Sequence, residues 1–276
     1  MERWNRDRGI RMKKRIITGV LGASLFLIAL LLGRWIYIGL VFLLATVAFL
    51  EYSYMHRINW KFSVLISLLL LWTILLSGLA SHQIIPPYAL FQEPNNLLSW
   101  MIFLFFLIVL SSNRFDLHQM AYLFVGALYI GYGFSFMLQT IWKQNGLILT
   151  LFILLVTWAN DTCAYFFGKY YGKHKPWPKI SPNKTWEGSI AGMGAGVLLG
   201  LILATIFPEL GSMVAVIMLA LLITIVGQLG DLIESSWKRT IGVKDSGTIL
   251  PGHGGILDRF DSLLLTFIVL HLMDLV

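Results

Sequence analysis

The stretch "KDSGTILPGHGGILDRFDS" (residues 244–262) runs directly into "LLLTFIVLHLMDLV" (residues 263–276). The first part contains three aspartates, two basic residues, one histidine and four glycines, whereas the second part is almost entirely apolar. An apolar run of this kind is typical of a helix that enters a lipid bilayer. Because charged side chains at the start of such a helix are costly to bury in hydrocarbon, they indicate a functional site.

The composition of the whole chain places it among membrane proteins. Of its 276 residues 57% are hydrophobic and only 13% are charged, and the mean hydropathy is +0.76. A soluble domain would carry about 25% charged residues. The net charge of +7 fits basic residues gathered on the cytosolic side of a membrane, so we expect no nucleic-acid partner. The single cysteine excludes an internal disulfide and a pair of thiolate metal ligands.

The chain is predicted to be an all-α polytopic integral membrane protein with about nine transmembrane helices. The expected helices are nine apolar segments of suitable length, at residues 16–32, 36–55, 61–80, 97–112, 121–142, 147–168, 189–208, 212–234 and 255–275. The predicted organisation has three parts: a basic cytosolic tail (1–15), five N-terminal helices (16–142) and a C-terminal catalytic region of four helices (143–276). Cytosolic loops at 169–188 and 235–254 are expected within the last part.

The distribution of basic residues predicts the orientation. With the N-terminus in the cytosol, 18 of the 21 Lys and Arg residues fall in cytosolic segments, and only Arg34 and Lys143 fall outside. Arg259 lies within the last helix. This bias follows the positive-inside rule and predicts a cytosolic N-terminus and an external C-terminus.

This topology places five carboxylates near the cytosolic ends of three helices. Asp161 belongs to the sixth helix, Asp231 and Glu234 belong to the eighth, and Asp258 and Asp261 belong to the ninth. Each of the two pairs is spaced i,i+3 and therefore shares a helix face. Clustered carboxylates need cations, and oxygen ligands without thiolates favour Mg²⁺.

The two expected cytosolic loops contain features that suit phosphate. Glycines at 252, 254 and 255 precede the last helix, and "SPNKT" (181–185) precedes the seventh. Glycine lets backbone N–H groups approach a ligand, and helix N-termini favour anions. The spacing is not that of a P-loop. Together with the carboxylates, these loops indicate metal-assisted phosphoryl or nucleotidyl transfer at the membrane surface.

The seventh helix has a glycine at every fourth position. Gly188, Gly192, Gly196 and Gly200 form a stripe that allows a neighbouring helix to approach closely. We interpret the stripe as a packing feature that draws helices together around the polar site.

The segment "SSWKRTIGVKDSGTILPGHGGILDRFDS" (235–262) closely resembles the signature of the phosphatidate cytidylyltransferases, also called CDP-diacylglycerol synthases. The matching positions are Ser235, Trp237, Lys238, Arg239, Lys244, Asp245, His253, Gly254, Gly255, Ile256, Asp258, Arg259, Phe260 and Asp261. The segments "NDTCAYFFGKYYGKHK" and "ISPNKTWEG" also look like blocks of this family. The resemblance implies that CTP and phosphatidate react to CDP-diacylglycerol and pyrophosphate, with Mg²⁺ and plausibly K⁺ as a second cation, in a homodimer.

The resemblance also implies roles for individual residues. The expected metal ligands are Asp231, Asp258 and Asp261, with Asp161 assisting. The expected catalytic residues are Lys238, Arg239, Lys244, Asp245, Asp258, Arg259 and Asp261. The expected substrate contacts are Ser181, Asn183, Lys184, Thr185, Glu187, His253, Gly254 and Gly255; for Asp245 and Glu187, a role as ligand and a role as salt-bridge partner both stay open.

Two other functions compete with this hypothesis. A nucleotide-dependent polyprenol kinase would share a surface metal site and basic loops but would transfer the γ-phosphate. A cation-coupled secondary transporter also buries carboxylates, but near the bilayer midplane rather than at one surface. The short polar segments suggest a bacterial cytoplasmic membrane, with the site facing the cytosol.

Overall fold

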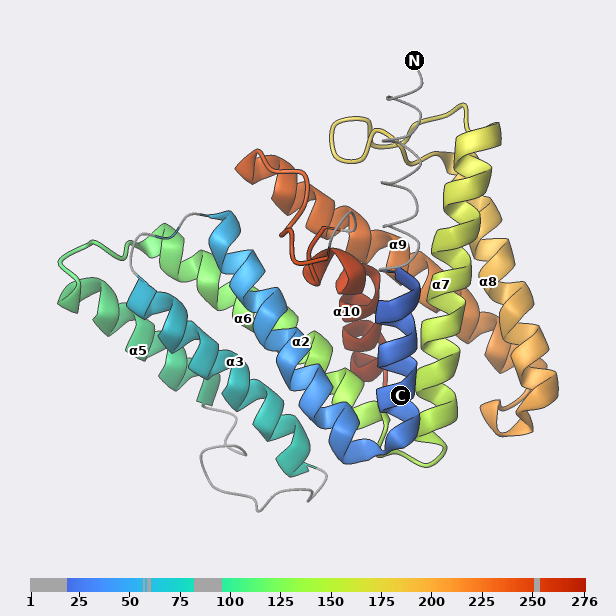
Figure 1. Cartoon of the computed structure of the whole chain (residues 1–276), viewed down its shortest axis with the longest axis horizontal. Coiled ribbons are helices and arrows are strands. Elements are labelled where there is room, and N and C mark those ends of the chain that lie inside the picture. The colour runs from blue at the N-terminus through green and yellow to red at the C-terminus, as the bar shows by residue number, and fades with distance from the viewer. Residues whose placement is uncertain (1–18, 57, 59–60, 82–95, 251–253) are drawn as a thin grey trace. The chain divides into compact units, whose positions relative to one another are not determined.

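The computed structural model describes residues 19–56, 58, 61–81, 96–250 and 254–276. Within these residues the secondary structure is helical, apart from an isolated bridge between Leu250 and Gly254. A helix over Gly19–Leu32 precedes the labelled helices of Figure 1. Those are α2 (Arg34–Met55), α3 (Lys61–Ser81), α5 (Asn96–Leu110), α6 (Leu117–Thr140), α7 (Gly146–Tyr171), α8 (Trp186–Ile206), α9 (Met213–Ile241) and α10 (Leu257–Leu272). A short 3-10 helix without a label in the figure, η1 (Pro208–Leu210), lies between α8 and α9 in the chain.

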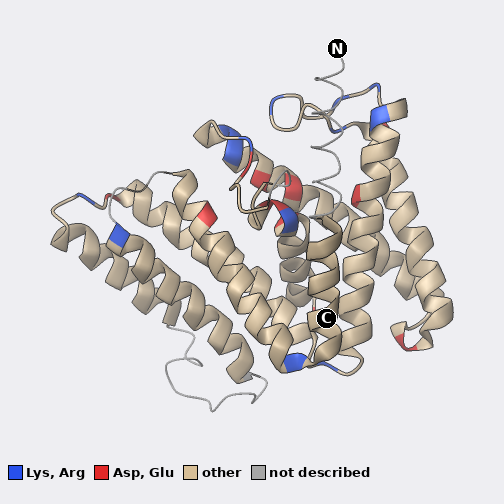
Figure 2. Ribbon diagram, viewed as in Figure 1, with Lys and Arg blue, Asp and Glu red and all other residues tan. Residues whose placement is uncertain are grey.

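The prediction of an all-α fold is confirmed for the residues that the structure describes. Within the described residues, a helix occupies each of the nine apolar segments, and six helices are long and apolar enough to cross a membrane: α2, α3, α6, α7, α8 and α9. Figure 2 shows the charged residues mostly near helix ends and in connecting segments, with long uncharged stretches between them. Large apolar side chains such as Leu25, Leu43 and Phe106 are exposed, as expected where lipid is the solvent. The number of nine spans and their orientation stay predictions.

The boundaries of α9 differ from those expected. The helix does not end near residue 234 but continues through Ser235 to Ile241, so the expected loop at 235–254 begins with two helical turns. Lys238 and Arg239 lie in the last turn, where positive charge favours the helix dipole. Gly242 ends the helix in the left-handed conformation (φ 80°). Hydropathy alone misses these turns because their residues are polar.

The chain forms two compact units. The first comprises the described parts of Met1–Phe134 together with Val243–Phe260, and the second comprises Ser135–Gly242 together with Asp261–Val276. In the first unit Tyr52 of α2 stacks on Tyr122 of α6 with ring centroids 4.1 Å apart, and each hydroxyl donates to the other residue's carbonyl oxygen. Gly126 makes room for the Tyr52 ring, because a Cβ there would collide with it.

The second unit is built around α7, α8 and α9, which pack against one another. The glycine stripe of α8 is buried in this packing. A Cβ at Gly188 would meet the carbonyl of Ala164, and one at Gly192 would meet the carbonyl of Asn160, both on α7. Farther along, a Cβ at Gly196 would collide with Thr224 of α9. The stripe therefore serves helix packing, as the sequence indicates.

Candidate active site

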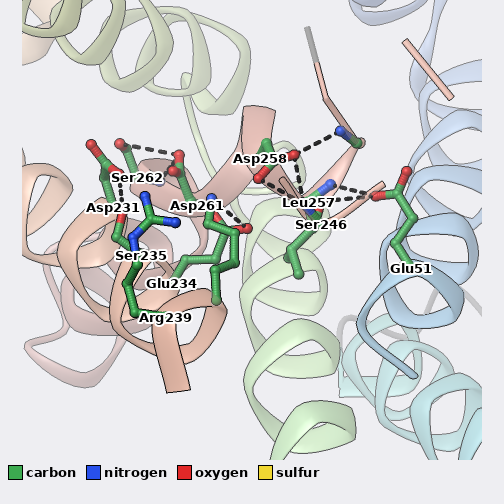
Figure 3. Close-up of polar contacts among 12 residues, drawn as sticks. Glu51, Asp231, Glu234, Ser235, Arg239, Ser246, Leu257, Asp258, Asp261 and Ser262 are labelled. Atoms are coloured by element: carbon green, nitrogen blue, oxygen red, sulfur yellow. Dashed lines mark hydrogen bonds and ion pairs between the residues drawn. The ribbon is translucent and has the colours of Figure 1, made fainter. Parts of the chain in front are cut away.

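Four carboxylates converge in the second unit. Asp161 of α7 and both Asp231 and Glu234 of α9 lie close enough to Asp261 of α10 for their charges to repel its carboxylate. Figure 3 draws Asp231, Glu234 and Asp261 with their polar contacts. Ser262 donates its backbone N–H to Asp261 Oδ1 at 2.7 Å. The structure therefore brings together four of the five carboxylates that the sequence singles out.

A close approach of two helices explains why α9 and α10 carry these acids to one place. A Cβ at Gly230 would clash with the carbonyl oxygen of Asp261 and lie 3.2 Å from Ser262 Cα. The missing side chain lets the two backbones approach, and Asp231 follows Gly230 directly in α9. Gly230 is thus a residue of the site that the sequence analysis missed.

Lysines neutralise part of this negative charge. Lys184 Nζ lies 2.8 Å from Asp231 Oδ2 and donates to the carbonyl oxygen of Gln228 at 3.1 Å. Lys238, one turn after Glu234 on α9, lies 3.3 Å from its carboxylate, and both side chains are buried. Because unpaired charges are costly in an apolar interior, these pairs stabilise the acids in place. They also leave ammonium groups beside the carboxylates, where an anionic substrate would need them.

A network of amides extends the site along α7 and α8. Gln228 Nε2 donates to Asn160 Oδ1 at 2.8 Å and to the carbonyl oxygen of Ser189 at 3.1 Å. The Asn160 side chain is fully buried and donates to Asp161 Oδ1 at 2.9 Å. The network therefore holds Asp161 in place from α9, and neither amide stands out in the sequence.

Asp258 has a different setting in the first unit. Its Oδ2 accepts hydrogen bonds from the backbone N–H groups of Ser246 at 2.9 Å and of Gly255 at 2.7 Å. Gly254 adopts a positive φ of 83°, and a Cβ there would collide with Asp258 Oδ2. The aspartate thus holds the two ends of the loop together, as Figure 3 shows. Three N–H contacts to its two oxygens still leave acceptor capacity on the carboxylate.

The Ser181–Glu187 segment has a mainly structural setting. Thr185 caps α8, because its hydroxyl accepts the backbone N–H of Gly188 at 3.2 Å. Glu187 contacts His174 Nδ1 at 2.6 Å and accepts the backbone N–H groups of Lys173 and His174. The structure therefore shows Glu187 held by His174 and by the backbone of the segment after α7. Ser181 is half-buried and Asn183 is exposed at the surface of the same segment.

The remaining candidates lie on loops or on the surface. Arg239 donates from Nε to the carbonyl oxygen of Ile180 at 3.2 Å, which links α9 to the segment before α8. Lys244, Asp245 and Arg259 are exposed, and Gly255 is buried. His253 lies outside the described residues.

Carboxylate oxygens are the donors that hard divalent cations such as Mg²⁺ take in proteins. Asp231 and Asp261 supply oxygen ligands, and no histidine or cysteine accompanies them among the residues that repel Asp261. In the part of the chain that the structure describes, no three acidic, histidine or cysteine side chains are arranged as a ready-made metal site. At Asp231, the ammonium of Lys184 lies 2.8 Å from the carboxylate.

Glu51 is a further acidic residue that the sequence analysis missed. It lies on α2, is 4% exposed, and its Oε2 accepts the backbone N–H of Leu257 at 3.0 Å. An isolated glutamate in an apolar helix is a signal that could have identified it.

Comparison with known proteins assigns the family. Residues 13–276 match the model of the cytidylyltransferase family. The chain is similar to the phosphatidate cytidylyltransferase of Bacillus subtilis, with 39% identity over 92% of this chain and 94% of that protein. It is also 39% identical to the Staphylococcus epidermidis protein of the same name and 37% identical to that of Staphylococcus aureus, each over 95% of this chain and 98% of the relative. The chain therefore belongs to the cytidylyltransferase family.

Proposed function

We propose that this protein transfers CMP from CTP to phosphatidate and so makes CDP-diacylglycerol and pyrophosphate for phospholipid synthesis. The observation that carries the proposal is the convergence of Asp161, Asp231, Glu234 and Asp261, with Lys184 and Lys238 paired to two of them, in a chain of this family. The relatives named above carry the name phosphatidate cytidylyltransferase, which gives both substrates.

The proposed reaction is an in-line displacement at the α-phosphorus of CTP. An ionised phosphate oxygen of phosphatidate forms the new P–O bond. The bond from the α-phosphorus to the oxygen that bridges to the β-phosphate breaks, and pyrophosphate leaves with its electron pair. The attacking oxygen already carries a negative charge near neutral pH, so positioning and charge neutralisation contribute more than a general base.

The proposed metal ligands are Asp231, Asp258 and Asp261, with Asp161 assisting and K⁺ as the proposed second cation. Asp258 and Asp261 lie one turn apart on α10, and Asp231 is the neighbour of Asp261 in the second unit. Bound Mg²⁺ would neutralise phosphate oxygens and favour departure of pyrophosphate. The role of the carboxylates themselves is to present negatively charged oxygen atoms at fixed positions, where a cation would bind.

The basic residues are proposed to receive the two anionic substrates. Lys184 and Lys238, which are ion-paired in the structure, would exchange carboxylate for phosphate oxygens when CTP binds. Arg239 and Lys244 would contact the triphosphate, and Arg259 with His253 would orient the lipid phosphate. Each such contact is a charge-assisted hydrogen bond, which is stronger than a neutral one.

The site is proposed to face the cytosol of a bacterial cytoplasmic membrane, in a homodimer with nine spans per chain. Basic residues concentrate in the segments that this orientation places inside. CTP is a cytosolic metabolite, whereas phosphatidate reaches the site from the bilayer. Light scattering of the detergent-solubilised protein would measure the number of chains per particle.

A pyrophosphate-release assay with the purified full-length chain tests the function. CTP, dCTP, ATP and GTP would each be combined with phosphatidate, diacylglycerol or a polyprenol, with and without Mg²⁺. We expect release only with a cytidine nucleotide, phosphatidate and Mg²⁺ together. Label from [α-³²P]CTP should enter the lipid, whereas label from the γ-position should not. Lipid labelled from the γ-phosphate would instead identify a kinase, and absence of any labelled lipid would reject both enzymes.

Variants connect the activity to the acidic cluster. Asp231→Asn should lower kcat at least a hundredfold while the protein elutes and unfolds like the wild type. Glu209→Gln, which also removes one acidic group but lies exposed in η1, is the matched control and should retain full activity. Near-normal turnover of the Asp231 variant would reject the role of the cluster.

A further inference from the structure

Glu51 connects α2 to the loop before α10, within the first unit. It lies four residues before the end of α2, and 206 residues separate it from Leu257. Its carboxylate is buried, with 4% of the residue exposed. Burial of a carboxylate in an apolar helix costs free energy unless hydrogen-bond partners compensate for the lost hydration. A carboxylate in such a position therefore indicates a function, and its contacts show where to look for it.

Those contacts lie at the start of α10. Leu257 is the first residue of the helix, and its N–H donates to Glu51 Oε2 at 3.0 Å. The hydroxyl of Ser246 lies 3.4 Å from the same oxygen. The first N–H groups of a helix have no partner within the helix, and negative charge near them is favourable. Glu51 thus caps α10 from a different helix.

Two glycines of the loop lie against this carboxylate, where a side chain would not fit. A Cβ at Gly255 would collide with Glu51 Oε2, and a Cβ at Gly247 would approach Glu51 Oε1 at 2.5 Å. The loop backbone therefore passes directly over both oxygens. This contact gives a physical reason for glycine at positions 247 and 255 that is independent of substrate.

Asp258 holds the same loop from the other side. It accepts the N–H groups of Ser246 and Gly255, while Glu51 contacts the Ser246 hydroxyl and the Leu257 N–H. The two carboxylates together contact Ser246 on one side and Gly255 and Leu257 on the other, as the dashed lines in Figure 3 show. If Glu51 were removed, Asp258 would be the one of these two carboxylates that still holds the loop.

We propose that Glu51 is a positioning residue of the transferase: it fixes the start of α10 and thereby the direction in which Asp258 presents its carboxylate. The kinetic consequence of this inference rests on the proposed function. A displacement of about 1 Å at a reacting centre lowers the rate about a hundredfold. The structural consequence, a loop ordered by Glu51, does not depend on any activity.

Hydrogen exchange measured by mass spectrometry on the solubilised full chain tests the structural part. In Glu51→Ala we expect at least tenfold faster exchange of the amides of Ser246, Gly255 and Leu257, with α3, α6 and α8 unchanged. Glu51→Gln, which keeps one acceptor oxygen, should show a smaller effect. Glu209→Gln should exchange like the wild type. Unchanged exchange in the loop, or equally faster exchange throughout α2, α3 and α6, would overturn the proposal.

Kinetics test the functional part. For Glu51→Ala we expect kcat at least tenfold lower and a higher half-saturating Mg²⁺ concentration, with the KM for phosphatidate within about twofold. A loss of stability alone would lower the active fraction without moving the Mg²⁺ dependence, and that result would contradict a positioning role. If Glu51→Ala does not fold, Gly255→Ala displaces the same carboxylate and must give the same local change in exchange. Absence of pyrophosphate release from the wild type would reject the proposed function and leave the exchange result standing.

Discussion

The ion pair between Lys184 and Asp231 is the residue-level feature that bears most directly on metal binding. The two groups lie 2.8 Å apart, with 21% and 35% of their side chains exposed. Asp231 also accepts the Ser235 hydroxyl at 3.1 Å. The ammonium of Lys184 neutralises the carboxylate that is proposed to bind Mg²⁺. The lysine and the metal ion would therefore compete for the carboxylate of Asp231. The energy of the pair is reduced by solvent screening and is about 1 kcal/mol.

Replacement of Lys184 by methionine separates these roles. Lys184→Met keeps the length of the side chain but removes its charge, so Mg²⁺ should bind about fivefold more tightly in the absence of CTP, equivalent to about 1 kcal/mol. The kcat should fall at least tenfold, because the triphosphate loses a cationic partner. Titration of Mg²⁺ followed by thermal unfolding measures the first effect, and pyrophosphate release measures the second.

Lys179→Met is the control for this prediction. Lys179 is exposed in the segment between α7 and α8, so its loss changes the net charge equally without touching Asp231. Both its Mg²⁺ affinity and its turnover should match the wild type. An unaltered Mg²⁺ affinity in Lys184→Met would show that the lysine does not compete with the metal.

At the level of elements, the start of α8 depends on Thr185. Its hydroxyl accepts the Gly188 N–H at 3.2 Å, and the residue is 4% exposed. Thr185→Ala should destabilise the protein by about 1 kcal/mol, the usual cost of a lost helix cap, which lowers the Tm by about 2–4 °C. Because the hydroxyl is buried and engaged, the KM for CTP should stay within twofold. Thr185→Ser keeps the cap and should restore the Tm, whereas a tenfold rise in KM would assign the hydroxyl to substrate.

The contact between α7 and α8 depends on the glycine stripe. A Cβ at Gly192 would lie 2.7 Å from the carbonyl oxygen of Asn160 and 2.8 Å from its Oδ1. Backbone oxygen cannot rotate away, so Gly192→Ala must separate the helices, at about 1–3 kcal/mol. The displaced Asn160 holds Asp161, so activity should fall as well as stability. Thermal unfolding and pyrophosphate release measure the two losses.

Gly194 provides the matched control on the same helix. No atom lies within 4 Å of a Cβ built there. Gly194→Ala should therefore keep full activity, and stability should stay constant or rise by up to about 1 kcal/mol, the difference in helix propensity. Equal effects of the two alanines would show that the stripe is not what holds α7 and α8 together.

At the level of the whole molecule, the proposed topology places the two ends of α7 on opposite sides of the membrane. Lys143 precedes this helix and Lys179 follows it. The 26 residues of α7 extend about 39 Å, which exceeds the hydrocarbon thickness of a bilayer. The segment after α7 (172–185) contains four lysines, whereas the segment before it (141–145) contains one.

Cysteine labelling in intact cells tests this orientation. In a chain with Cys163→Ser, a membrane-impermeant maleimide should label Lys143→Cys from outside the cell and should label Lys179→Cys only after the membrane is opened. The positive-inside rule is the physical reason. Each variant serves as the control for the other, and the reverse pattern of labelling would contradict the proposed topology.

Much of this protein is determined by local sequence. Hydrophobic runs of bilayer length specify helices, because a segment in lipid must satisfy its own backbone hydrogen bonds. The four-residue spacing of glycines on α8 and the i,i+3 spacing of acids on α9 and α10 specify which residues share a face. These features depend on neighbours along the chain, so the helices and the candidate acids could be predicted.

Contacts between distant segments were decided only by the tertiary structure. Nothing in the sequence around Glu51 pairs it with Leu257, and nothing near Gly230 shows that its missing side chain admits Asp261. Asn160 and Gln228 are ordinary amides until folding joins them. Such partners meet because helices that are far apart in sequence pack closely. The periodicity of a single sequence does not indicate which helices pack together. The sequence therefore determined which acids exist and on which helix faces, whereas packing decided which side chains hold them.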